Sequence, residues 1–153
     1  MKKKGLFIIT FLLICFSLCG CGFHKDTISL EQLQEIAIQK EYEYMDSTES
    51  FKEDKNIKRV GMVASNYWHL EFYEFNDVKS AEEIFESNKK SFEKEKQNTS
   101  LEEENHSWNS ETYSLTTATE YMYISRIQNT LLFARVPVEY RSNVKSFVKS
   151  IQY

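Results

Sequence analysis

The three cysteines of this 153-residue chain, Cys15, Cys19 and Cys21, lie close to its N-terminus. A cysteine sulfur can form a disulfide, bind a metal, attack a substrate or carry a lipid. Three lysines, Lys2 to Lys4, precede a largely apolar run from Leu6 to Leu18. The run fits the apolar part of a secretory leader and is shorter than the ~20 residues of a membrane-spanning helix. The residues after Cys21 therefore offer no thiol for a disulfide, a metal or catalysis.

The residues Leu18-Cys19-Gly20-Cys21 resemble the lipobox of bacterial lipoproteins, with Cys19 at a place where Ala or Ser is usual. This resemblance implies cleavage between Gly20 and Cys21 and a diacylglycerol joined to Cys21 by a thioether. We therefore expect a signal peptide over 1–20, a short lipidated tether over 21–27 and a single domain over 28–153. An uncleaved N-terminal membrane anchor is the alternative. Both interpretations predict a protein attached to the outer side of the cell membrane.

The predicted exported part is acidic. Removing 20 of 153 residues leaves 133, among which 16 Lys and Arg face 23 Asp and Glu. A chain of this length suits one domain with one hydrophobic core. Nucleic acid binding needs a basic surface, so the charge excludes nucleic acid as an expected partner. The remaining predicted partners are membrane lipid, through Cys21, and an envelope protein, peptide or glycan.

No familiar catalytic, metal or cofactor motif is present. His24, His69 and His106 have no histidine or cysteine partner at ligand spacing. Glu102 to Glu104 and His106 lack the Asp, Asn and Gly pattern of a calcium loop. Serine-nucleophile and zinc-protease motifs are missing as well. We therefore predict no catalytic residue, no metal and no cofactor.

Hydrophobic periodicity predicts the elements that follow the leader. Ser29 and Gln32 form a capping box before a helix expected over 30–45. Further helices are expected after Asn76-Asp77 and after Pro137, and residues 97–109 are expected to be a polar loop. Strands are expected over 58–64, 67–75, 112–117, 121–128 and 130–136. The order α-β-β-α-β-β-β-α predicts an α+β domain with a single, mainly antiparallel sheet and its helices on one face.

Aromatic residues make up 14% of the chain and gather in the predicted strands. Strand alternation predicts one sheet surface, here called the tyrosine face, with six members: Tyr67, His69, Glu71, Tyr73, Tyr121 and Tyr123. Such a surface could stack on sugar rings or bind a peptide or protein. The same rings could instead be cross-strand pairs that stabilise the sheet.

The combined features favour a non-catalytic binding or interaction module on the outer membrane surface. Two alternatives stay open. One is a small ligand-capturing domain that serves a transporter, which a deep apolar pocket would favour. The other is an envelope enzyme that uses His69 with Glu71 or Tyr73.

Lipidation is directly testable. We expect Cys21→Ala to abolish metabolic labelling by a radioactive or clickable fatty acid, because the variant lacks the sulfur that would carry the lipid. The protein should then be released from the membrane or remain unprocessed. Cys19→Ala is the matched control and should be labelled as the natural sequence is. Persistent labelling of Cys21→Ala would refute the assignment.

Overall fold

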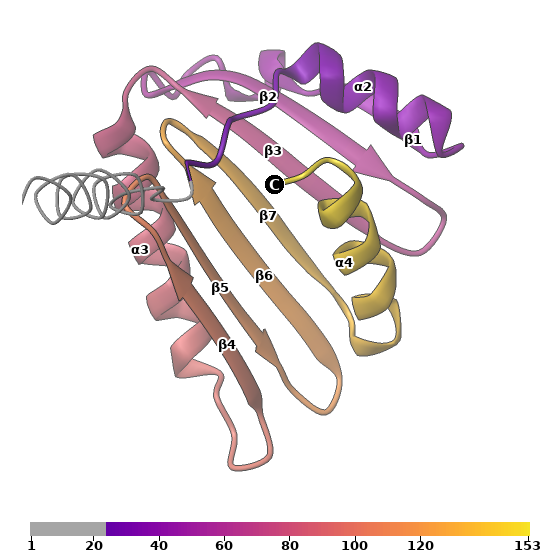
Figure 1. The fold of residues 1–153 in the computed structure, drawn as a ribbon, viewed down its shortest axis with the longest axis vertical. Coiled ribbons are helices and arrows are strands. Elements are labelled where there is room, and N and C mark those ends of the chain that lie inside the picture. The colour runs from indigo at the N-terminus through magenta and orange to yellow at the C-terminus, as the bar shows by residue number, and fades with distance from the viewer. Residues whose placement is uncertain (1–23) are drawn as a thin grey trace, which may run out of the picture.

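The structure is a computed structural model that describes residues 24–153, shown in Figure 1. The predicted signal peptide, Cys21 and the first part of the tether lie outside the described residues. Residues 24–153 form one seven-stranded antiparallel sheet with three α-helices, which confirms the predicted α+β class. Within this range, no helix combines the length and hydropathy needed to cross a membrane.

The sheet has the spatial order β1-β2-β3-β7-β6-β5-β4, and every neighbouring pair is antiparallel. Two runs of hairpin-connected strands, β1 to β3 and β4 to β7, are joined by helix α3 and meet where β3 pairs with β7. The bounds are α2 Leu30–Gln39, β1 Glu43–Asp46, η1 Thr48–Phe51, β2 Ile57–Ala64, β3 His69–Phe75, α3 Val78–Lys94, β4 Leu101–His106, β5 Ser110–Thr116, β6 Glu120–Ile127, β7 Thr130–Pro137, η2 Val138–Tyr140 and α4 Arg141–Ser150.

The helices lie on both faces of the sheet, so the prediction that they share one face is wrong. Figure 1 shows α2 and α4 in front of the sheet and α3 behind it. The physical reason lies in β6, where every residue from Tyr121 to Ile127 is buried. A strand that is buried on both sides needs a covering layer on each, and one layer of helices cannot supply both.

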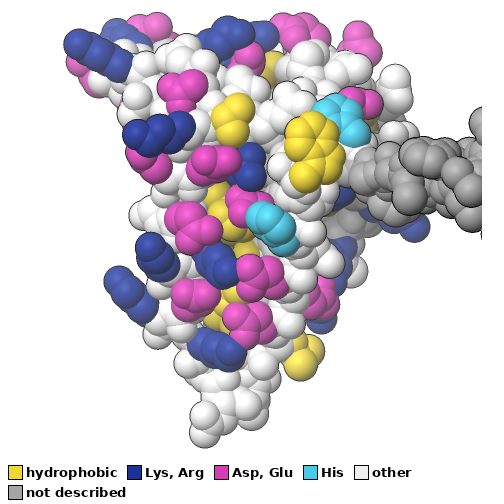
Figure 2. Space-filling model, turned by 60° about the vertical axis from the view of Figure 1, so that its left-hand side comes forward, with side chains coloured by type: hydrophobic (Ala, Val, Ile, Leu, Met, Phe, Trp, Pro, Cys, Tyr) yellow, Lys and Arg dark blue, Asp and Glu magenta, His cyan; other side chains and the backbone are white. Residues whose placement is uncertain are grey.

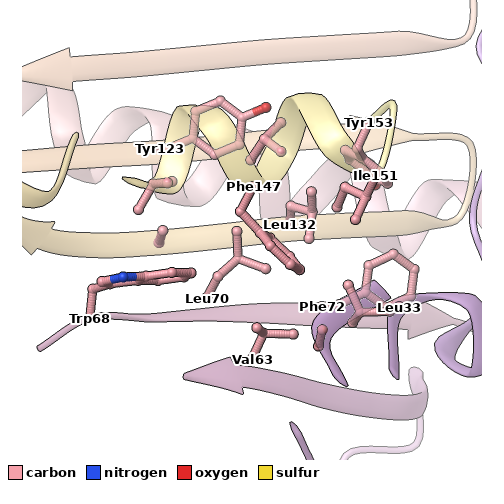
Figure 3. Packing of buried hydrophobic residues seen from close by; sticks show 14 of the residues in the cluster. Leu33, Val63, Trp68, Leu70, Phe72, Tyr123, Leu132, Phe147, Ile151 and Tyr153 are labelled. Carbon is pink, nitrogen blue, oxygen red and sulfur yellow. The ribbon is translucent and has the colours of Figure 1, made fainter. Parts of the chain in front are cut away.

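The larger core lies between the sheet and the pair α2 and α4. In Figure 3, Phe147 of α4 reaches toward Leu70 of β3 and Leu132 of β7. Leu33 of α2 packs in the same cluster. The C-terminal Tyr153 closes one end of this core; its hydroxyl accepts from the backbone N–H of Ile127 at 3.2 Å and lies 2.8 Å from the Thr130 hydroxyl. All of these side chains are less than a tenth exposed.

The smaller core lies between the sheet and α3. The helix begins after Asp77, whose carboxylate accepts from the Ser80 backbone N–H at 2.7 Å, as the sequence predicts. Phe85 and Phe92 are buried against the sheet. Ile84, on the same helix, is 39% exposed. It stands at the margin of α3, where the helix stops covering the sheet.

Helix α2 has the predicted capping box, since Ser29 and Gln32 exchange side-chain to backbone hydrogen bonds. It ends at Gln39, earlier than the predicted residue 45. Glu41 adopts a positive φ of 60° and turns the chain into β1. Tyr44, which lies at helical spacing from the apolar residues of α2, is in strand β1 and packs against the larger core from there.

The predicted polar loop over 97–109 contains an edge strand, β4. Its side chains alternate between the two helical layers: Glu102 and Glu104 pair with Lys96 and Lys89 beside α3, and Glu103 pairs with Lys145 of α4. Figure 2 shows acidic and basic side chains alternating over this side of the molecule. Hydrophobic periodicity misses such a strand, because its period of two is carried by charge.

Gly61 of β2 is required by close packing under α2. A Cβ atom at this position would lie 2.3 Å from Cδ2 of the buried Leu30 and 3.0 Å from the Tyr44 hydroxyl. We therefore expect Gly61→Val to lower the free energy of unfolding by about 1–3 kcal/mol. Denaturant unfolding followed by tryptophan fluorescence measures this. Ala64→Val, on the same strand at a partly exposed position, should change it by less than ~0.5 kcal/mol; equal effects would contradict the packing argument.

Candidate functional site

The six residues of the predicted tyrosine face do not share one surface. Directly paired residues of antiparallel strands point to the same side. Tyr121 and Tyr123 pair with Val136 and Ala134, on the side covered by α2 and α4. The alternating residues of β3 that point to the opposite side are His69, Glu71 and Tyr73. The sequence placed β6 one residue out of phase with β3, so the face as predicted is wrong.

Tyr121 and Tyr123 belong to the larger core. Tyr121 is fully buried, and Arg141 of α4 lies over its ring at 5.7 Å. Its hydroxyl is buried without a hydrogen-bond partner among the described residues. Tyr67 precedes β3 and stacks on Tyr140 of η2, with ring centroids 5.7 Å apart. These three tyrosines therefore stabilise the fold or its margin and do not line a common site.

The remaining three predicted residues lie on a surface that α3 leaves uncovered. Figure 1 shows α3 behind β4 to β7, while β1 to β3 extend past it. We call this surface the open face; it has seven members, Met45, Met62, Ala64, His69, Glu71, Tyr73 and Phe133. All are partly or fully exposed, and Met45 reaches 54%. Met45 and Met62 were not among the predicted site residues, because the short strand β1 was not predicted and Met62 had no predicted role.

Glu71 is the polar centre of the open face. The Tyr73 hydroxyl donates to Glu71 Oε2 at 2.5 Å. Burial and this hydrogen bond raise the pKa of Tyr73, so the phenol keeps its proton at neutral pH. His69 Nε2 lies 3.8 Å from Glu71 Oε1, beyond hydrogen-bond distance. The arrangement leaves Glu71 Oε1 able to accept a hydrogen bond from a bound group.

A cavity of about 230 Å³ adjoins Glu71 and Tyr73. It lies between α3 and the sheet, and Ile84 and Asn88 of α3 form one wall while Phe133 lies on the other. The rings of Phe51 from η1 and Tyr73 pack edge to face, with their centroids 5.6 Å apart. The cavity is smaller than the ~300–1,000 Å³ of typical drug-sized ligand sites. Its size and apolar walls fit one apolar side chain or a single ring.

Two other features could form a site, a groove and a metal centre. An open groove of about 540 Å³ lies between residues 24–28, α2 and the end of α4. Most of its lining residues are polar, and none of the six predicted residues of the tyrosine face lies in it. Across residues 24–153, no group of three His, Cys, Asp or Glu side chains is placed to hold a metal ion. The open face is therefore the best candidate site.

The comparisons with known proteins give little to transfer. No protein family model matches the sequence, and no curated protein matches it. A solved structure that is similar to the chain is the crystal structure of a GTP-binding regulator from Thermotoga maritima. The two share 16% sequence identity with a TM-score of 0.49, over 84% of this chain and 89% of the other.

Substitutions at two buried tyrosines, Tyr121 and Tyr153, test how much each hydroxyl contributes to stability. Tyr121→Phe removes a hydroxyl that has no partner in the described structure, so the free energy of unfolding should stay within ~0.5 kcal/mol or rise. Tyr153→Phe is the matched control. It removes a hydroxyl bonded to Ile127 and beside Thr130, and should cost about 1–3 kcal/mol. Denaturant unfolding of both variants checks this, and a larger loss for Tyr121→Phe would contradict the assignment.

Proposed function

We propose that this protein is a lipid-anchored binding module on the outer side of the cell membrane, and that its open face holds an extended polypeptide segment of an envelope protein. The anchoring rests on the leader and Cys21. The observation that carries the binding role is the uncovered half of the sheet, where Glu71 and Tyr73 stand among apolar side chains beside a cavity. Such a mixture of apolar contact area and a few polar groups is typical of recognition surfaces.

The chemistry of the open face suits a polypeptide. Met45 and Met62 are unbranched and polarizable, so they adapt to irregular apolar partners. The cavity beside Tyr73 has room for one apolar anchor side chain. Glu71 Oε1 can accept a hydrogen bond from a backbone N–H or a basic side chain. Among the described strands, β1 pairs with β2 alone, so its outer edge is available to an added strand.

A glycan is the weaker occupant. Sugar recognition favours accessible aromatic planes on which rings can stack, and the predicted platform had four tyrosines. The structure buries Tyr121 and Tyr123 and places Tyr67 against Tyr140 at the margin. Tyr67 is 68% exposed with one ring plane against Tyr140, and the ring of Tyr73 is already contacted by Phe51 and Phe75, so the exposed tyrosines do not form one shared platform.

Capture of a small ligand is the second candidate function, and the cavity of about 230 Å³ favours it. A ligand of one ring could fill the space between Ile84 and Phe133, with Glu71 and Asn88 as polar contacts. A polypeptide accounts for more of the surface, because the exposed methionines lie outside the cavity. The two candidates predict different products in the same experiment.

Site-specific photocrosslinking in intact membranes tests the proposal. A photoreactive phenylalanine analogue at Met62 should give a protein adduct, because Met62 lies within the open face. The matched control places the same analogue at Ile38, which is 61% exposed on α2 at the opposite side of the sheet. The adduct at Met62 should weaken with Glu71→Gln, which removes the carboxylate charge that a basic group would meet.

Three results would count against the polypeptide. Equal amounts of adduct at Met62 and Ile38 would show that partner proteins do not contact the open face more than they contact α2. A product that resists protease but yields to glycosidase would favour a glycan. Binding of a small ligand that is lost in Ile84→Trp, with no protein adduct at Met62, would favour the second candidate.

A further inference from the structure

The first described residues are fixed to one turn of the domain. The His24 ring stacks on Trp108, with centroids 5.2 Å apart and an interplanar angle of 25°. Asn109 Nδ2 donates to the Lys25 carbonyl at 2.8 Å and lies 3.1 Å from His24 Nδ1. Both Trp108 and Asn109 belong to the turn between β4 and β5. Figure 1 shows the indigo start of the described chain beside this hairpin.

This contact determines which end of the domain lies nearest the anchor. Gly22 and Phe23 separate His24 from Cys21 in the sequence. Three residue steps span at most about 11 Å. A lipid on Cys21 therefore holds the β4–β5 turn within roughly that distance of the membrane surface.

The exposed chemistry of this turn suits a lipid headgroup layer. Trp108 is 71% exposed, which is unusual for so large an apolar side chain. Tryptophan is enriched at membrane–water interfaces, because its ring is apolar and its indole N–H can donate a hydrogen bond. Trp68, by contrast, is buried in the larger core.

We propose that the β4–β5 turn is the surface by which the anchored domain contacts the membrane, with Trp108 at headgroup depth. The partner is the lipid bilayer itself. This inference rests on the proposed lipidation of Cys21 and adds to it a defined orientation. Cys21 supplies attachment, and the stack of His24 on Trp108 joins the attachment point to one end of the sheet.

Fluorescence quenching by brominated lipids tests the orientation. The full-length protein carrying Trp68→Phe keeps Trp108 as its one tryptophan. It is processed in cells, purified with its lipid and placed in phosphatidylglycerol–phosphatidylethanolamine vesicles whose acyl chains are brominated near the headgroup. We expect loss of fluorescence relative to the same vesicles without bromine.

The matched control moves the indole to the start of β4, the strand that leads into the turn. Trp68→Phe and Trp108→Phe are combined with Leu101→Trp, at a position that is 59% exposed. Leu101 lies seven residues before Trp108, a strand length of about 24 Å. We expect no quenching there. Quenching of equal size at both positions, or none at Trp108, would overturn the orientation.

Flotation of the same vesicles separates this failure from failure of the proposed anchoring. Protein that floats without quenching at Trp108 is anchored but not oriented by the turn, which overturns the inference alone. Protein that does not float, and is not labelled by fatty acid, overturns both. Should Trp68→Phe not fold, Trp108→Cys labelled with an environment-sensitive dye gives the same readout, with Leu101→Cys as its control.

Discussion

The burial of β6 on both faces, together with the part of β7 beside it, is the constraint on which the rest of the structure depends. Tyr123 and Ala134 point into one core, and Ile124 and Leu131 point into the other. Two covering layers must therefore exist, and α3 has to cross from the β1–β3 half to the back of the β4–β7 half. With one helix on that side, α3 covers only part of the sheet. The open face is the part of this side of the sheet that α3 does not reach.

Much of the fold could be predicted, because local signals were strong. The capping box at Ser29 and the cap at Asp77 located two helix starts, and the hairpin spacing indicated an antiparallel sheet. The sequence does not show which residues of β6 point to which side of the sheet. Both of its alternating sets are largely apolar, so an alternating pattern does not distinguish the two sides. The edge strand β4 was missed because its side chains from Glu102 to Glu104 are all acidic, and the partners of Glu103, Arg141 and Lys145, are distant in sequence.

The candidate site, like the fold, could be predicted only in part. His69, Glu71 and Tyr73 were placed together correctly, because Leu70 and Phe72 alternate with them and fix the direction of β3. Their grouping with Tyr121 and Tyr123 needed the register across β7, which depends on pairing between distant strands. The contribution of Met45 needed the left-handed turn at Glu41, which no residue-type signal announced.

The ion pairs along β4 bear on how copies of this domain would meet one another under the proposed membrane anchoring. An exposed edge strand is a template on which a second chain can add, and confinement to a surface raises the rate of such encounters. On β4, each successive carboxylate from Glu102 to Glu104 is already bound to a basic side chain in or next to the flanking helices. A joining strand would have to place its own side chains beside this charged row on both faces of the sheet, and charged side chains on an edge strand disfavour such pairing. The six-residue edge of the sheet is thereby protected against sheet extension between neighbouring copies.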